Sequence, residues 1–79
     1  MSIDRRDRVL GVVTSVLGLQ PGDVVPELTR GVHPAWDSLR HLDLVMELES
    51  ALGWRLSLDE ITSMRTVADI LARAERGGD

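Results

Sequence analysis

Apolar residues recur at helical spacing in four stretches of this chain. In the first stretch, over residues 4–17, the residues that share one helical face are Val9, Val13, Val16 and Leu17. Ser2 or Asp4 is suited to cap this helix, and Gly18 is suited to end it. The pattern predicts a helix over 4–17.

The second stretch covers residues 37–52 and is apolar around more than one face. Its apolar residues are Leu39, Leu42, Leu44, Val45, Met46, Leu48 and Leu52. A helix with so broad an apolar surface either lies at the centre of a bundle or presents some apolar residues to a partner. We predict a helix over 37–52, which Gly53 ends.

The third stretch is short and begins at the pattern of a capping box. Ser57 is suited to cap the helix, and Glu60 is suited to bond back to the backbone of Ser57. We expect a helix over 58–64 that buries Leu58 and Ile61.

The fourth stretch opens on a weaker box, in which Thr66 caps and Asp69 complements the helix dipole. Its inward-facing residues are Val67, Ile70, Leu71 and Ala74. These residues predict a helix over 67–76, followed by a frayed tail over 77–79.

The connection over residues 18–36 is long for a compact domain. It contains all three prolines, and its apolar residues are Val24, Val25, Leu28 and Val32. We expect these apolar residues to anchor the connection across the helices. The whole pattern predicts an all-α fold in a single domain over 1–79, with three principal helices, a short third helix and a long loop between the first two.

The composition narrows the class of protein. Hydrophobic residues are 43% of the 79 residues, but Phe and Tyr are absent and only two Trp are present, so the core is expected to be aliphatic. The formal charge of −4, without a basic patch, argues against nucleic-acid binding. No apolar run approaches the roughly 20 residues that span a bilayer, and residues 1–8 lack the apolar stretch of a signal peptide. We expect a cytoplasmic monomer that binds neither nucleic acid nor membrane.

The residues give little support for catalysis or metal binding. Ser38 and His41 can be neighbours on one helix, but a chain this small has little room for the oxyanion hole and cleft of a hydrolase. His33 and His41, with Asp37 and Asp43, lack the spacing of a known metal site, and two surface histidines are usually solvated. Because cysteine is absent, thiolate sites are excluded. We expect no catalytic residue and no metal.

Ser38 is better placed as the acceptor of a modification. It follows Asp37 at the mouth of a predicted helix and at the end of the long loop, so its hydroxyl is expected to be exposed. The helix N-terminus favours a nearby anion, including a phosphodiester. The alternative is that Asp37 or Ser38 serves only as an N-cap.

The surrounding residues favour the acceptor. From Trp36 to Glu49 the chain reads Trp-Asp-Ser-Leu-Arg-His-Leu-Asp-Leu-Val-Met-Glu-Leu-Glu, which closely resembles the phosphopantetheine attachment region of acyl carrier proteins. The order and length of the predicted elements extend the resemblance over nearly the whole chain. It implies an acyl-carrier-like four-helix bundle, in which a separate phosphopantetheinyl transferase moves a 4'-phosphopantetheine arm from coenzyme A onto Ser38. The arm's thiol then holds acyl groups as thioesters, so the chain is a carrier and not an enzyme.

The resemblance also implies that the second helix recognises partner enzymes. The positions that match are Leu39, Asp43, Leu44, Met46, Glu47 and Glu49. Acidic residues would steer basic patches on a partner, and apolar residues would make the final contact. Leu44 and Leu48 are also read as core residues, Met46 suits either role, and Glu47 and Glu49 also suit a solvated face.

This region departs from carriers of fatty-acid synthesis. Arg40 stands where an acidic residue is common, and residues 50–51 stand where glutamates often continue. Trp36 replaces a small residue and is expected to be buried. Arg40 either bonds the arm's phosphate or offsets Asp37 and Asp43. The pattern is more similar to free-standing carriers of polyketide or other specialised metabolism, whose partners include an acyl-loading enzyme and a ketosynthase.

Two other functions stay open at this stage. A peptidyl or aminoacyl carrier shares the fold and the arm, but it usually has Gly before the serine, where this chain has Trp36 and Asp37. An unmodified helical interaction domain would keep the fold without the arm.

Overall fold

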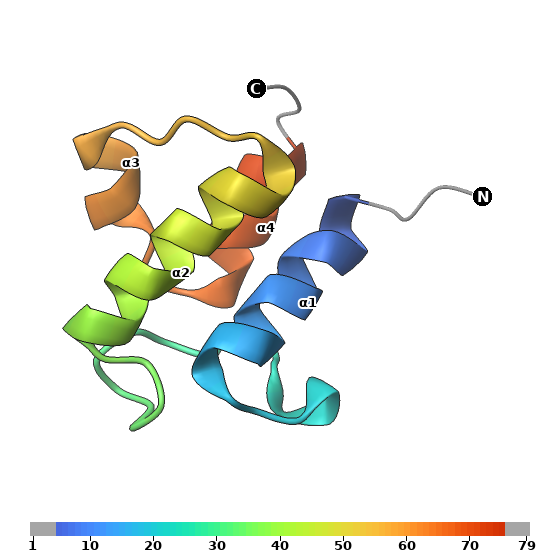
Figure 1. Ribbon diagram of the computed structural model, residues 1–79. Helices are drawn as coiled ribbons and strands as arrows, with labels where there is room; N and C mark the ends of the chain where they lie inside the picture. The colour runs from blue at the N-terminus through green and yellow to red at the C-terminus, as the bar shows by residue number, and fades with distance from the viewer. Residues whose placement is uncertain (1–4, 76–79) are drawn as a thin grey trace.

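Four α-helices and one short 3-10 helix make up the fold (Figure 1). The computed structural model describes residues 5–75. The elements are α1 (Arg5–Leu17), the 3-10 helix η1 (Pro21–Asp23), α2 (Ser38–Leu52), α3 (Leu58–Ser63) and α4 (Val67–Glu75). Within the described range, the single extended pairing is an isolated bridge between Thr29 and Thr66. The predicted all-α bundle, with a short third helix and a long loop, is confirmed.

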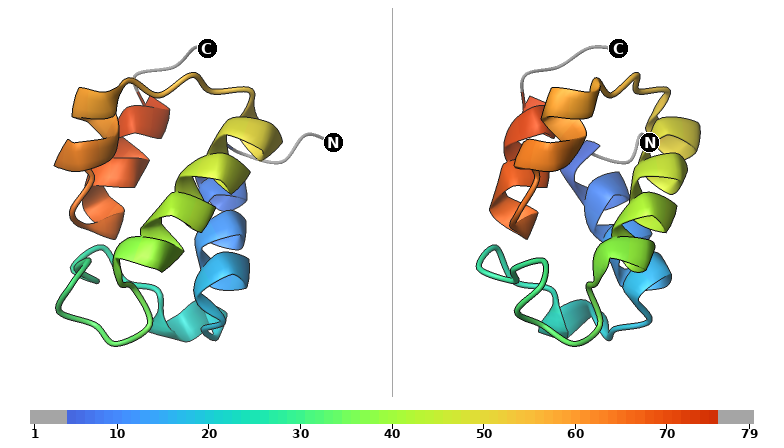
Figure 2. Two further views of the ribbon diagram at one scale, coloured as in Figure 1. Left: turned by 60° about the vertical axis from the view of Figure 1, so that its left-hand side comes forward. Right: turned by 90° about the vertical axis from the view of Figure 1, so that its left-hand side faces the viewer.

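The helices surround one core, which is mostly aliphatic but also contains Trp36 and Trp54. Helix α1 packs against both α2 and α4, and the different views show α1 and α2 side by side (Figures 1 and 2). The largest fully buried side chains are Trp36, Leu44, Leu48, Ile70, Val9, Val13 and Val67. They come from α1, α2, α4 and the end of the long loop, so the loop contributes to the core that the helices share.

The helix ends that fall inside the described residues lie within one residue of those predicted. Asp37 precedes α2 as its N-cap, and Met64 follows α3 as its C-cap. Position 4, the suggested caps Ser2 and Asp4, the predicted helix end at 76 and the tail over 77–79 lie outside the described residues.

Both predicted caps of the last two helices are present. At α3, the Ser57 hydroxyl accepts from Glu60 N at 3.1 Å, and Ser57 N donates to the Glu60 carboxylate at 3.0 Å. At α4, the Asp69 carboxylate accepts from the backbone N–H groups of Arg65 and Thr66, each at 3.0 Å. These bonds lower the pKa of the Asp69 carboxyl, and the bond from Arg65 N has the largest effect. Satisfied N-termini explain how such short helices persist.

Gly53 ends α2 in the left-handed conformation, with φ of 69°. Gly53→Ala is expected to lower the free energy of unfolding by about 1 kcal/mol, because a Cβ is disfavoured in this region. Gly11 lies inside α1, and a Cβ there would meet nothing within 4 Å. Gly11→Ala is therefore the matched control and is expected to raise stability by up to about 1 kcal/mol. Urea unfolding of both variants measures the difference, and equal signs would contradict it.

The prediction that α3 buries Leu58 and Ile61 was wrong. Leu58 is 77% exposed, Ile61 is half-buried, and none of the residues of α3 is buried. A helix of six residues is too short to lay a full stripe on the core, and Leu58 is its first residue. Met64, directly after the helix, is buried instead.

The long loop is anchored at fewer apolar residues than expected. Leu28 is buried and Val24 is half-buried, but Val25 and Val32 are exposed. Backbone hydrogen bonds also hold the loop in place, because it runs beside the turn between α3 and α4. Backbone hydrogen bonds there join Arg30 N to Arg65 O at 2.7 Å, Val67 N to Leu28 O at 3.1 Å and Ala68 N to Pro26 O at 3.0 Å.

Candidate functional site

Ser38 is the first residue of α2 and its side chain is exposed. The capping role belongs to Asp37, whose carboxylate accepts from Arg40 N at 2.8 Å. Among residues 5–75, no hydrogen bond involves the Ser38 hydroxyl. Asp37 or Ser38 was predicted as the N-cap, and the structure shows that Asp37 is the cap. The Ser38 hydroxyl therefore faces solvent at the positive end of a helix.

Trp36 is fully buried, as expected, and it is tied to α2 through His41. The indole Nε1–H of Trp36 donates to His41 Nδ1 at 3.2 Å. His41 Nε2 lies 2.9 Å from the carbonyl oxygen of Ile61 in α3. Because Nδ1 accepts, Nε2 must carry the proton and donate to Ile61, so the two bonds together assign one neutral tautomer.

The expectation that His41 is a solvated surface side chain was wrong. His41 is 5% exposed and shares the inward face of α2 with Leu44, Val45 and Leu48. Burial lowers the pKa of His41 below its ordinary 6.5, because the charged ring loses its hydration. The Ile61 carbonyl opposes this shift, and the nearby Arg30 guanidinium adds to it.

Arg40 makes a contact that the sequence did not suggest. Its guanidinium donates to Val16 O, in the last turn of α1, at 3.4 Å. Helix α1 has no basic residue of its own in that turn, so Arg40 supplies a cation at the negative end of α1. The guanidinium lies on the exposed surface beside the start of α2.

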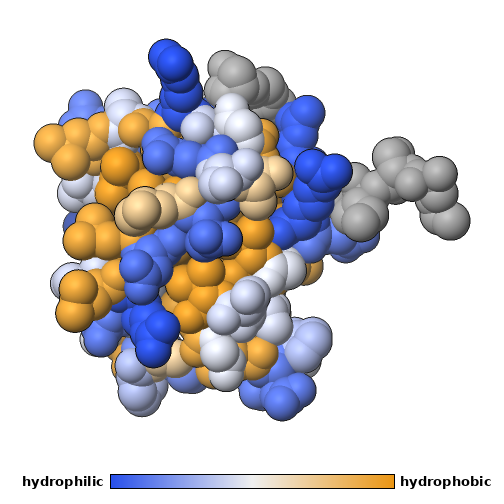
Figure 3. Space-filling view, in the orientation of Figure 1, coloured by the Kyte–Doolittle hydropathy of each residue, from blue (hydrophilic) through white to orange (hydrophobic). Residues whose placement is uncertain are grey.

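The outer face of α2 carries three exposed apolar side chains, Leu39, Leu42 and Met46. We call these three residues the apolar ridge. Asp43 is exposed on the same helix. Leu58 of α3 is also exposed, and the space-filling view shows apolar side chains along the side formed by α2 and α3 (Figure 3). Of the residues expected to recognise partners, Leu39, Asp43 and Met46 are thus accessible, whereas Leu42 was considered only as part of the helical stripe.

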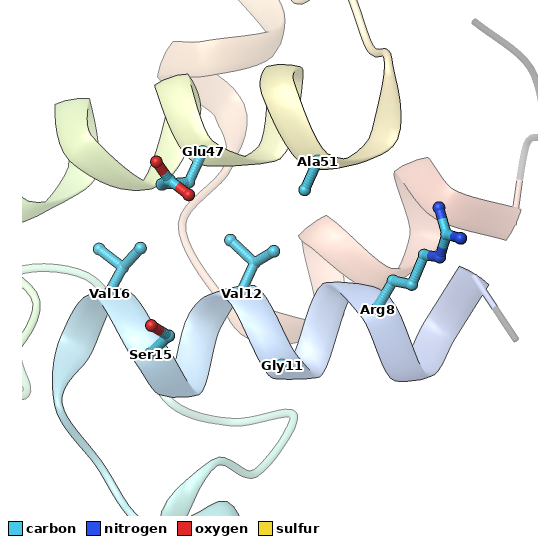
Figure 4. A pocket seen from close by; sticks show the side chains of 7 residues that line it. All are labelled: Arg8, Gly11, Val12, Ser15, Val16, Glu47 and Ala51. Atoms are coloured by element: carbon cyan, nitrogen blue, oxygen red, sulfur yellow. The ribbon is translucent and has the colours of Figure 1, made fainter. Parts of the chain in front are cut away.

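Three other residues expected to recognise partners lie elsewhere. Leu44 is fully buried, which corrects its inclusion among them in favour of its other role, a core residue. Glu49 is half-buried, and its carboxylate accepts from Leu56 N at 3.0 Å, closing the link between α2 and α3. Glu47 is exposed but points toward α1 (Figure 4).

A shallow groove of about 350 Å³ separates α1 from α2 on this flank (Figure 4). Its apolar wall comes from Val12, Val16 and Ala51, with Arg8 toward one end and Glu47 above it. The groove and the apolar ridge lie on different faces of α2.

Two further observations concern the kinds of site that residues 5–75 can form. In that range, no three His, Cys, Asp or Glu side chains come together in an arrangement that could hold a metal ion. None of the described helices has the length and apolar character needed to cross a bilayer.

Comparison with known proteins decides the family. No protein-family model matches the chain. A curated relative, the acyl carrier protein of Thermosynechococcus vestitus, is 32% identical over 65 residues, which are 82% of this chain and 80% of that protein. The chain belongs to the acyl carrier protein family. Membership in the acyl carrier protein family fits an exposed serine at the start of a central helix, in a bundle with a short third helix.

Proposed function

We propose that Ser38 carries a 4'-phosphopantetheine arm and that the chain holds acyl or polyketide intermediates on it as thioesters. The arm supplies the thiol that a chain without cysteine lacks. The observation that carries the proposal is the division of roles at the start of α2, where Asp37 caps the helix and leaves the Ser38 hydroxyl exposed. Because the Ser38 hydroxyl makes no hydrogen bond among the described residues, a modifying enzyme can reach it without breaking a contact of the fold.

The surroundings of Ser38 suit a phosphodiester. The positive end of α2 favours an anion beside the first residue of the helix, and Ser38 occupies that position. In the transfer, Ser38 Oγ forms a bond to the phosphorus next to the pantetheine of coenzyme A, and the pyrophosphate P–O bond breaks. Adenosine 3',5'-bisphosphate leaves with the bridging oxygen, and the hydroxyl proton goes to a base of the transferase. We assign this chain the role of acceptor only, with no catalytic residue and no metal of its own.

The apolar ridge is the surface that we assign to partner enzymes. Beside Ser38, one face of α2 exposes the apolar side chains of Leu39, Leu42 and Met46. Asp43 adds a negative charge on the same helix. Arg40 places a positive charge beside Asp37 and Asp43, and the Glu49 carboxylate is half-buried and bonded to Leu56 N. We therefore infer partners that rely on apolar contact more than on charge, namely a phosphopantetheinyl transferase, an acyl-loading enzyme and a ketosynthase of polyketide or other specialised metabolism. We propose that the chain meets them as a monomer in the cytoplasm.

Intact-protein mass spectrometry tests the carrier role directly. Incubation with coenzyme A and a broad-specificity phosphopantetheinyl transferase is expected to add one phosphopantetheine to the chain, and Ser38→Ala is expected to abolish the addition completely. Ser50→Ala is the matched control, because Ser50 is an exposed serine on the same helix, and it is expected to leave the addition unchanged.

No addition to the folded chain, with the transferase active on a control carrier, would overturn the proposal in favour of an unmodified interaction domain. Loading of the modified chain by an adenylating enzyme with an amino acid, and not with acyl groups, would instead identify a peptidyl carrier.

A further inference from the structure

The segment that leads into Ser38 forms a turn, in which backbone hydrogen bonds join Trp36 to Gly31 and His33. Gly31 N donates to Trp36 O at 2.8 Å, and Trp36 N donates to His33 O at 3.1 Å. The Trp36 side chain is fully buried two residues before Ser38. The position of Trp36 therefore sets the path of the loop where it enters α2.

The only hydrogen bond of the Trp36 indole among the described residues goes to His41 Nδ1, at 3.2 Å. The two rings lie with their centroids 5.9 Å apart at a tilt of 37°. Protonation of a neutral imidazole at Nδ1 turns that acceptor into a donor. Two N–H groups would then face each other in a buried site, where an unmatched donor costs free energy.

The charged groups around His41 do not compensate for a proton there. Arg30 approaches from the loop, where its Nη1 lies 3.4 Å from the same Ile61 carbonyl that His41 bonds, so a second cation would sit beside the first. At the N-cap of the same helix, the Asp37 carboxylate accepts from Arg40 N. In α3, the Glu60 carboxylate is bonded to Ser57 N and to Arg73 Nε.

The other ionisable side chains of these segments are exposed or bonded elsewhere. Glu49 accepts from Leu56 N, and the carboxylates of Asp23, Glu27, Glu47 and Asp59 are exposed. His33 in the loop uses Nδ1 to accept from Ala35 N at 3.0 Å, and Asp43 is exposed on α2. No carboxylate among the described residues is thus hydrogen-bonded to the His41 ring, and the neutral form is the one that fits the site.

We propose that Trp36 and His41 form a pH-sensitive lock on the loop that leads into Ser38, closed when His41 is neutral and opened when His41 gains a proton. Opening frees the indole of Trp36 and with it the Gly31–Trp36 turn, while Nε2–H of His41 keeps its bond to Ile61. The lock acts on how Ser38 is presented, and it does not depend on the modification of Ser38.

The direction of the pH effect follows from the shifted pKa. Because burial lowers the pKa of His41 in the folded chain below 6.5, the unfolded chain binds this proton more readily than the folded one. The stability that the closed lock contributes is complete above pH 6.5 and is lost as the pH falls below that value, toward the lower pKa of the folded chain. The lock therefore opens as the pH falls below 6.5 toward the lower pKa of His41 in the folded chain.

Two indole N–H signals make the test direct, because Trp36 and Trp54 are the only tryptophans. In ¹H–¹⁵N spectra of the unmodified chain, titrated from about pH 7.5 to about pH 5, the Trp36 indole signal is expected to shift upfield in step with the His41 ring signals. The Trp54 indole signal is expected to stay in place, since Trp54 packs on Arg73, 4.8 Å from its guanidinium carbon. Far-UV circular dichroism should stay constant over the same range.

Variants assign the titrating group. His41→Gln is expected to abolish the shift of Trp36, and His33→Gln, which removes the other histidine, is expected to keep it. If His41→Gln does not fold, the comparison of the two indoles in the unaltered chain decides. A Trp36 signal that stays fixed while His41 titrates, or a joint shift of both indoles with loss of helix, would overturn the lock.

Discussion

Leu44→Ala is expected to lower the free energy of unfolding by about 3 kcal/mol. Leu44 is fully buried between α2 and the rest of the core, so truncation removes apolar burial and leaves a cavity that neighbouring side chains fill only in part. Urea unfolding followed by circular dichroism measures the loss. For a chain of 79 residues, such a loss is a large share of the free energy of unfolding.

Leu42→Ala is the matched control, with the same substitution two residues earlier on the same helix. Leu42 is 57% exposed, so its truncation is expected to change stability by less than about 0.5 kcal/mol. It is instead expected to slow the modification of Ser38 by a phosphopantetheinyl transferase, because Leu42 belongs to the apolar ridge. A stability loss from Leu42→Ala equal to that from Leu44→Ala would contradict the assignment of core and ridge.

Arg73→Ala is expected to lower the free energy of unfolding by about 2 kcal/mol. Arg73 is a buried cation in α4, with its guanidinium carbon 4.8 Å from the centre of the Trp54 ring and its Nε 2.9 Å from the Glu60 carboxylate. It therefore joins α4 to α3 and to the segment that follows α2. Thermal and urea unfolding report the loss, and the indole N–H signal of Trp54 in ¹H–¹⁵N spectra reports the local change.

Two further substitutions sharpen that test. Arg55→Ala removes an exposed guanidinium from the residue next to Trp54, and its effect is expected to stay within about 0.5 kcal/mol. Arg73→Lys keeps the charge but loses the planar group that stacks on Trp54, and it is expected to recover only part of the stability. Equal losses from Arg73→Ala and Arg55→Ala would show that the contact with Trp54 and Glu60 contributes nothing.

Local chemistry was enough to predict the helices of this fold. A capping box acts within four residues, and the Ser57–Glu60 box does so here with both bonds present. A glycine that ends a helix acts at one residue, as Gly53 does with its positive φ. The burial of Trp36 also followed from its size. Features that depend on neighbours in sequence, or on side-chain volume alone, were therefore accessible without the structure.

The role of His41 required contacts between distant segments. Its ring bonds Trp36 and the carbonyl of Ile61, which lies 20 residues away. One sequence pattern could still have indicated burial, because His41 precedes Leu44, Val45 and Leu48 at spacings of one and two helical turns. A histidine on an otherwise apolar face is a buried polar group that needs partners. The partners themselves cannot be predicted from this spacing.

The motif located the candidate site, but it did not show which of its residues are buried and which are exposed. The residues from Trp36 to Glu49 pointed to Ser38, yet the same residues could not separate Leu44 from Leu42, since both lie within a broad apolar surface. Packing against α1 and α4 makes that separation. The contact of Arg40 with Val16 likewise depends on how α1 ends beside α2.

The bridge between Thr29 and Thr66 has a kinetic meaning. It joins the long loop to the turn before α4, so it closes a span of chain that contains α2 and α3. Closing so long a span costs chain entropy before any contact compensates for it, which slows the step. The native path of the loop before Ser38 therefore depends on contacts between residues far apart in the sequence, which form more slowly than the local contacts of the helices.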